Sequence, residues 1–260
     1  MQYLVALILF LALAGGAQAK VITQTVEYKQ DGTVLEGFLA YDGAIKGPRP
    51  GVLVVHEFWG LNDFAKKRAE KLAEMGYVAL AADMYGKGVV TKDPQEARKL
   101  AGHLRGTPLM RTRALAGLDL LKHNKLVDPK RLAAIGFCFG GTTVLELAYA
   151  GADLAGVASF HGGLPSLKPE DAKNLKAKIL VLHGAEDPHI KAEEIAAFQE
   201  GLKKASADWQ MVYYGDAVHS FANPEAGLDK SKGAAYNAKA AARSWKEMQL
   251  FFQEIFSGSK

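Results

Sequence analysis

One pentapeptide, G-F-C-F-G from Gly136 to Gly140, constrains the fold of this 260-residue chain more than any other feature. It follows an apolar run, Leu132–Ile135, and precedes a run with helical character, Thr142–Tyr149. A glycine two residues before and two residues after Cys138 allows a sharp turn from a strand into a helix. Such a turn exposes the central side chain at the end of a sheet, where it can act as a nucleophile. Cys138, the single cysteine of the chain, is therefore our candidate nucleophile.

The alternative for Cys138 is a buried and inert side chain, because a free cysteine often behaves as a small hydrophobic residue. Against this, a tight turn with three glycines is a poor place to fill a core. The glycine frame and the strand-to-helix context therefore favour the nucleophile.

Residues 1–19 are interpreted as an export signal and not as part of the fold. The apolar run Leu4–Ala14 is followed by small residues and by Ala17-Gln18-Ala19, which matches a signal-peptidase site. Cleavage there starts the mature chain at Lys20 and predicts a periplasmic or secreted protein without stable membrane insertion. The alternative is an uncleaved membrane anchor, but the apolar run is short for a span of about 20 residues. An exported protein with one thiol cannot form an internal disulfide, so a reactive free thiol is expected.

The composition is that of an ordinary globular protein. With 49% hydrophobic and 23% charged residues, the chain can bury one good core, so we expect a single domain over residues 20–260. The formal net charge is only +4, and the basic residues are interleaved with acidic ones. A nucleic-acid partner is therefore not expected. No sustained heptad pattern is visible, and we expect a monomer.

Strand-like and helix-like segments alternate along the chain. The continuous apolar run Gly51–Val55 is typical of a strand that is covered on both faces. The stretch Asn62–Met75 instead spaces its apolar residues like a helix and stops before Gly76. The alternation predicts an α/β fold, with a mostly parallel central sheet flanked by helices on both faces. Strands are expected at 21–28, 33–39, 51–55, 77–81, 131–137, 154–160, 179–183 and 209–214, and helices at 62–75, 94–104, 110–123, 142–149, 192–205 and 235–256.

A cysteine nucleophile requires a base and an acid that orients the base. Asp187 is the candidate acid, because the apolar strand Ile179–His183 and a glycine-containing loop place it just beyond a strand end. Glu186 is the competing acid. The alternative role for Asp187 is to shape the turn before Pro188.

His219 is the candidate base. It lies after the last predicted strand and before the last predicted helix, where the order nucleophile, acid, histidine requires it. His103 and His123 lie on helical segments and are expected at the surface. The other histidines near strand ends, which position alone does not exclude, are His161, His183 and His189.

Two backbone N–H groups are needed to hold the oxyanion that forms during acyl transfer. One is expected from Phe139, directly after the nucleophile, and the other from the loop after Gly51–Val55, at about Phe58. The same loop contains Glu57, whose alternative role is that of a solvated or helix-capping acid.

Four segments together resemble the dienelactone hydrolase (carboxymethylenebutenolidase) family, a cysteine branch of the α/β-hydrolases. They are H-E-F-W-G from His56, G-F-C-F-G-G from Gly136, H-G-A-E-D from His183 and H-S-F-A from His219. The similarity extends over most of Val21–Phe256, with the same segment order.

The resemblance implies Cys138 as nucleophile, His219 as base and Asp187 as the orienting acid. It also implies that Glu57 contacts the resting thiol and helps to form the thiolate when substrate arrives. A thiol that stays protonated until then is protected from oxidation. Neither a metal nor an organic cofactor is implied, and the histidines show no metal-ligand spacing.

The family's substrate is a small unsaturated lactone whose carboxylate is held by two arginines. At the matching positions this chain has Lys87 and Asn223. Lysine can pair with a carboxylate without the bidentate fork of arginine, whereas asparagine carries no charge. Tyr85 and Trp59 are further candidate substrate contacts. For the aromatic pair Phe58 and Trp59, packing into the core is the alternative.

The sequence therefore predicts a hydrolase that cleaves a small ester or lactone through an acyl-thioester intermediate. One alternative is a broad carboxylesterase or thioesterase that does not act on dienelactone, which Asn223 favours. The other is a non-catalytic periplasmic binding protein on the same fold, against which the intact set of Cys138, Asp187 and His219 argues.

Overall fold

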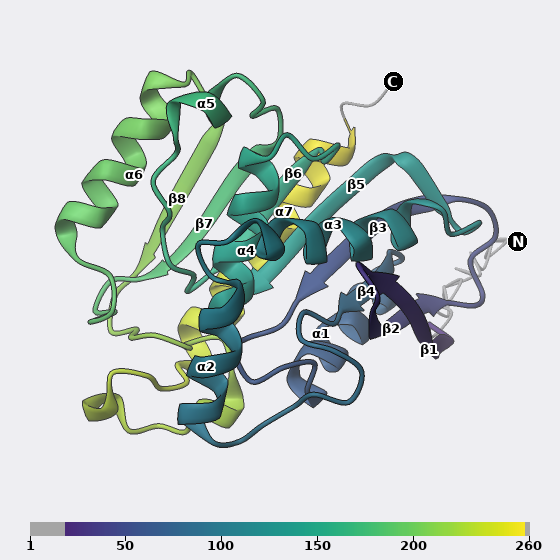
Figure 1. Cartoon of the computed structure of the whole chain (residues 1–260), viewed down its shortest axis with the longest axis horizontal. Helices are drawn as coiled ribbons and strands as arrows, with labels where there is room; N and C mark the ends of the chain where they lie inside the picture. The colour runs from purple at the N-terminus through teal and green to yellow at the C-terminus, as the bar shows by residue number, and fades with distance from the viewer. Residues whose placement is uncertain (1–18, 258–260) are drawn as a thin grey trace, which may run out of the picture.

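A computed structural model describes residues 19–257 and contains one eight-stranded sheet (Figure 1). The strand order is β1-β2-β4-β3-β5-β6-β7-β8. β1 pairs antiparallel with β2 and β2 with β4, while the other neighbouring pairs are parallel. The predicted mostly parallel sheet is thus confirmed. The strands are β1 (Val21–Gln30), β2 (Thr33–Asp42), β3 (Arg49–Val55), β4 (Val78–Ala82), β5 (Val127–Phe137), β6 (Gly156–Phe160), β7 (Lys178–Gly184) and β8 (Trp209–Tyr214).

Helices cover both faces of the sheet, as predicted. α1 and α7 pack on one face, and α3, α4 and α6 on the other, while α2 packs against α3 (Figure 1). The α-helices are α1 (Asp63–Glu74), α2 (Pro94–Leu104), α3 (Pro108–Lys122), α4 (Phe139–Tyr149), α5 (Pro169–Ala172), α6 (Ala192–Lys204) and α7 (Ala238–Ser257), and the short 3-10 helices are η1 (Pro224–Ala226) and η2 (Lys230–Lys232).

The central strand β3 explains why its sequence is continuously apolar. Leu53 and Val55 belong to the core beneath α3 and α4, whereas Val52 and Val54 belong to the core beneath α1. All four side chains are fully buried. Since successive strand residues point to opposite faces, a strand between two helical layers needs an apolar residue at every position.

Several element boundaries differ from the prediction. β5 begins at Val127 and not at Arg131. The prediction missed its first part because Asp128–Arg131 contains no apolar run and is partly or fully exposed. α4 begins at Phe139 and not at Thr142. The prediction placed the start too late because Gly140 and Gly141 have low helix propensity. The four-residue helix α5 is too short to produce a periodic pattern.

The predicted signal peptide falls almost entirely outside the described residues, because residues 1–18 are not among them. Within residues 19–257, no helix is both long enough and apolar enough to cross a membrane.

Candidate active site

Three predicted site residues lie beyond the carboxyl ends of parallel strands. Cys138 directly follows β5, Asp187 lies in the loop after β7, and His219 lies in the segment between β8 and α7. The strands β5 to β8 are parallel neighbours, so the segments that follow them meet at one edge of the sheet.

The backbone at Cys138 forms the predicted sharp turn. Its φ of 53° lies in the left-handed region, which residues other than glycine rarely adopt. The two flanking glycines are required by close approach: a Cβ on Gly136 would lie 2.0 Å from the Gly140 carbonyl oxygen, and one on Gly140 would lie 2.1 Å from that of Val55. The glycine frame therefore lets the start of α4 sit directly against β3 and β5.

The side chains of Cys138, His219 and Asp187 form one continuous chain of contacts. The Nε2 atom of His219 lies 3.0 Å from the Cys138 Sγ, and its Nδ1 atom lies 2.8 Å from Oδ2 of Asp187. The Asp187 side chain is fully buried and that of His219 is 14% exposed. Oδ1 of Asp187 also accepts the His189 N–H at 2.9 Å, which orients the carboxylate.

The electrostatics of these three contacting side chains favour a protonated His219. Burial alone would lower its pKa, but the nearby Cys138 and Asp187 outweigh burial and raise the pKa well above its ordinary value. Burial would likewise raise the pKa of Asp187, but the hydrogen bond and charge of His219 lower it overall. A positive imidazole is therefore stabilised between the carboxylate and the sulfur atom.

The alternatives for acid and base lie elsewhere around the site. Glu186 is paired with Lys230 and accepts the Asp216 N–H. His189 is exposed and touches the His219 ring edge-on, at 5.2 Å between ring centroids. His183 is buried against Tyr213. Of the histidine side chains in residues 19–257, only that of His219 has a ring nitrogen bonded to the Cys138 sulfur atom.

The backbone N–H groups of Phe58 and Phe139 are both unpaired within residues 19–257. The direction of the Phe58 N–H is set through its own peptide group, because the carbonyl oxygen of Glu57 accepts a hydrogen bond from Nδ1 of His56. The His56 tautomer follows from its other nitrogen, Nε2, which accepts the Met84 N–H at 3.2 Å.

Tyr85 and Trp59 lie in this same region. The Tyr85 hydroxyl donates to the Phe58 carbonyl at 3.1 Å, and its ring lies 5.8 Å from that of Phe139. Trp59 is half-buried, with its ring 4.2 Å from the Phe58 ring. Both aromatic side chains thus support the loop that carries the Phe58 N–H, in addition to any contact with substrate.

Glu57 is bonded to two side chains that follow His219 in the sequence. Its Oε1 accepts the Ser220 hydroxyl at 3.3 Å, and its Oε2 accepts the Asn223 amide at 2.5 Å. Glu57 is 1% exposed and Asn223 is 3% exposed. Burial raises the pKa of Glu57, although Asn223, His219 and Ser220 each favour its charged form. The thiol is bonded to His219, and no hydrogen bond joins it to Glu57 within the described residues.

The residues at the positions of the family's two arginines, Lys87 and Asn223, are both bonded to acidic side chains, and their contact with substrate stays a prediction. Lys87 forms ion pairs with Glu27 on β1 and Glu36 on β2. The Asn223 side-chain amide donates a hydrogen bond to Glu57. The sequence could not show either pairing, because each joins residues that are far apart along the chain.

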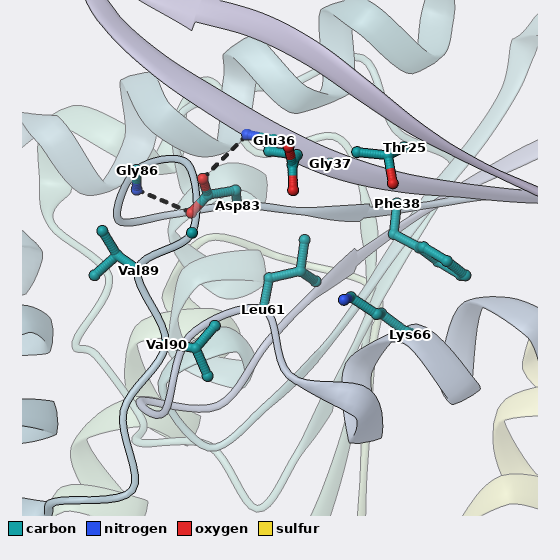
Figure 2. A pocket seen from close by; sticks show the side chains of 11 residues that line it. Thr25, Glu36, Gly37, Phe38, Leu61, Lys66, Asp83, Gly86, Val89 and Val90 are labelled. Atoms are coloured by element: carbon teal, nitrogen blue, oxygen red, sulfur yellow. Dashed lines mark hydrogen bonds between the residues drawn. The ribbon is translucent and has the colours of Figure 1, made fainter.

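The segment that carries Lys87 lines a separate hollow, shown in Figure 2. Asp83 holds this segment, since its carboxylate accepts the N–H groups of Tyr85, Gly86 and Glu36. The hollow contains none of the predicted site residues. Its lining consists of Thr25, Glu36, Gly37, Phe38, Leu61, Lys66, Asp83, Gly86, Gly88, Val89 and Val90.

One residue next to Cys138 was not selected by the sequence analysis. His161 directly follows β6, is fully buried, and its Nδ1 lies 3.1 Å from the Cys138 backbone nitrogen. The only available signal was its position at a strand end, which it shares with other histidines.

Comparisons with known proteins agree with this geometry. A family model described as the dienelactone hydrolase family matches residues 35–256. The chain is 28% identical over 239 residues to protein usf of Aquifex pyrophilus, which covers 90% of this chain and 99% of that protein. It is 28% identical over 235 residues to an Aquifex aeolicus protein provisionally named carboxymethylenebutenolidase, covering 88% and 97% of the two chains.

Solved structures give closer matches. The dienelactone hydrolase-like promiscuous phosphotriesterase P91 from metagenomic libraries is 42% identical, with a TM-score of 0.86 and coverage of 90% of this chain and 98% of P91. A structure named m3DLH is 43% identical with the same TM-score and coverage.

Proposed function

Because this chain belongs to the dienelactone hydrolase family, we propose that it hydrolyses a small carboxylic ester or lactone with Cys138 as the nucleophile. The observation that carries the proposal is the line of contacts from Asp187 through His219 to the Cys138 sulfur atom, at 2.8 and 3.0 Å. This is the arrangement of nucleophile, base and orienting acid that acyl transfer requires.

In the first half of the reaction, the Cys138 thiolate attacks the carbonyl carbon while His219 holds the proton on Nε2. The electrons of the carbonyl bond move to oxygen, and the N–H groups of Phe58 and Phe139 stabilise the resulting oxyanion. When the carbonyl re-forms, the bond to the alcohol oxygen breaks. That oxygen takes the proton from His219, and an acyl thioester remains on Cys138.

In the second half, water hydrolyses the thioester. His219 takes a proton from the water as its oxygen attacks the carbonyl carbon, and the same two N–H groups hold the second oxyanion. Collapse of this intermediate breaks the carbon–sulfur bond and releases the acid. Cys138 returns as the thiolate beside a protonated His219, so the net reaction is ester plus water giving acid plus alcohol.

Glu57 is proposed to regulate the thiol through the segment that carries His219. Its carboxylate is bonded to Ser220, the residue next to His219, and burial favours its protonated form. A change in the charge of Glu57 would therefore reach the base through one adjacent residue and through space.

Neutral acyl esters are a second candidate substrate class beside dienelactone. Lys87 is paired with Glu27 and Glu36, and Asn223 is uncharged and bonded to Glu57. The similarity to P91, whose description names it a promiscuous phosphotriesterase, supports phosphotriesters as a further class of uncharged ester.

The test is turnover of cis- and trans-dienelactone, p-nitrophenyl acetate and a p-nitrophenyl phosphotriester by wild type and Cys138→Ala. We expect turnover of at least one carboxylic ester or lactone that disappears in the variant, together with an acylated Cys138 after an acid quench. Hydrolysis of the neutral ester alone selects the second candidate. Undiminished turnover in Cys138→Ala, or no turnover of any of these compounds, would overturn the proposal.

A further inference from the structure

His161 is a fully buried histidine beside Cys138 to which the proposed mechanism assigns no step. It follows β6, which lies between β5 and β7 in the sheet. Its Nδ1 lies 3.1 Å from the Cys138 nitrogen, and the Phe160 carbonyl oxygen lies 3.0 Å from the same nitrogen. The Cys138 N–H is therefore shared between two acceptors at the end of β6.

The hydrogen bond defines the protonation of the His161 ring. A backbone N–H can only donate, so Nδ1 must accept and carries no proton. In the neutral ring the proton is then on Nε2, which has no hydrogen-bond partner within residues 19–257. Burial, followed by the charges of His219, Arg68 and His183, lowers the pKa of His161 well below its ordinary value.

Both ends of this hydrogen bond have unusual backbone conformations. φ is 39° at His161 and 53° at Cys138, whereas left-handed conformations are uncommon for residues other than glycine. Conformations of this kind persist where surrounding interactions hold them, and they cluster at active sites. The His161–Cys138 bond is one such interaction, because it joins the two strained positions directly.

The His161 ring also packs against the base. Its centroid is 5.4 Å from the His219 ring and 5.3 Å from the Phe221 ring, both in edge-on geometry. His161 therefore touches both partners of the sulfur–imidazole contact, one through a hydrogen bond and the other through its ring face or edge.

We propose that His161 is a positioning residue, whose neutral ring accepts the Cys138 N–H and supports His219, so that the sulfur atom stays within hydrogen-bond distance of the base. This inference rests on the proposed role of Cys138 as the nucleophile. It adds a requirement to that role, namely an unprotonated nitrogen behind the thiol.

The charges around His161 explain why the ring has to stay neutral. The groups near it are His219 after β8, His183 on β7, Arg68 on α1 and Cys138 after β5. A proton on Nδ1 would remove the acceptor for Cys138. The added positive charge would also oppose the protonated His219 that stabilises a thiolate.

The experiment uses the pH dependence of alkylation of the single thiol by iodoacetamide, which requires no ester substrate. His161→Asn retains an acceptor close to the ring and tolerates a positive φ, whereas His161→Leu has similar branching without an acceptor. We expect His161→Asn to react within about threefold of wild type at neutral pH. His161→Leu should react about tenfold or more slowly, since one lost hydrogen bond is worth roughly 1.4 kcal/mol, a factor of ten. The pH profile of its alkylation should also differ from that of wild type.

His183→Leu is the matched control, because His183 is another buried histidine on the neighbouring strand and has no hydrogen bond to Cys138. Thermal unfolding is measured on every variant, and His161→Gly, which permits positive φ, replaces His161→Leu if that variant does not fold. The inference is overturned if the acceptor-free variant reacts with the wild-type rate and pH profile, or if His161→Asn or His183→Leu slows as much. If the variants show the expected alkylation pattern but wild type hydrolyses none of the tested esters, the substrate proposal is refuted and this inference stands.

Discussion

Asp187→Asn tests whether the buried carboxylate is what stabilises a protonated His219. Oδ2 of Asp187 lies 2.8 Å from the His219 Nδ1, and the Asp187 side chain is fully buried. The substitution removes a negative charge and nearly preserves the shape. Two estimates bound its effect. A hydrogen bond to a charged group is worth about 1.5–3 kcal/mol, and two charges about 4 Å apart interact by roughly 4 kcal/mol at an effective dielectric constant near 20.

A loss of about 2–4 kcal/mol lowers the pKa of His219, and every 1.36 kcal/mol is a factor of ten in the population of the ion pair. The population with a thiolate beside a protonated imidazole then falls about 30- to 1,000-fold. We expect the alkylation rate of Cys138 near neutral pH to fall by that factor, and ester turnover to fall at least as far. The assay is iodoacetamide alkylation followed by mass spectrometry, as a function of pH.

Glu186→Gln is the matched control, since it removes a neighbouring carboxylate that is half-exposed and paired with Lys230. We expect this variant to react within about twofold of wild type, as for other exposed ion pairs. The reasoning is refuted if Asp187→Asn keeps the wild-type alkylation rate and pH profile, or if Glu186→Gln loses as much as Asp187→Asn.

Three further predictions concern Glu57, two glycines and the ion pairs of Arg111. Glu57→Gln should change both the alkylation rate of the thiol and its response to substrate, because it removes a buried ionisable group next to the segment that carries His219. Gly140→Ala should lower the free energy of unfolding by about 3 kcal/mol or more, since its Cβ would meet a β3 carbonyl oxygen, whereas Gly102→Ala in α2 should raise it by about 0.5–1 kcal/mol. Arg111→Met should lower it by about 1 kcal/mol at neutral pH, because Arg111 is bonded to Glu146 and Asp171.

The pH dependence of the last variant has a definite sign. The hydrogen bond from Arg111 lowers the pKa of Asp171 in the folded state, so this pair adds stability above the unfolded value of about 3.9. That stability is lost as the pH falls through the folded pKa, and the difference between Arg111→Met and wild type should shrink below about pH 4. Denaturant unfolding at several pH values measures it, and a difference that grows on acidification would contradict the assignment. Equal unfolding free energies for Gly140→Ala and Gly102→Ala would contradict the packing argument. Unchanged alkylation of the thiol in Glu57→Gln would contradict the proposed role of Glu57.

Much of the fold could be predicted because its determinants are local. The continuous apolar run of β3 indicated a strand buried on both faces, and helical spacing followed by Gly76 indicated α1. The start of α4 was placed too late, since two glycines in its first turn satisfy a packing requirement that propensity does not contain.

The sequence by itself determined the strand–turn–helix around Cys138 and the order in which Asp187 and His219 follow it, because glycine frames and strand ends are written in neighbouring residues. Only the tertiary structure decided that Lys87 pairs with Glu27 and Glu36, that Asn223 bonds to Glu57, and that His161 accepts the Cys138 N–H. Each of these contacts joins segments brought together by the order of strands in the sheet and the packing of the loops beyond them. Their partners are therefore set by distances in space, which no local pattern along the chain encodes.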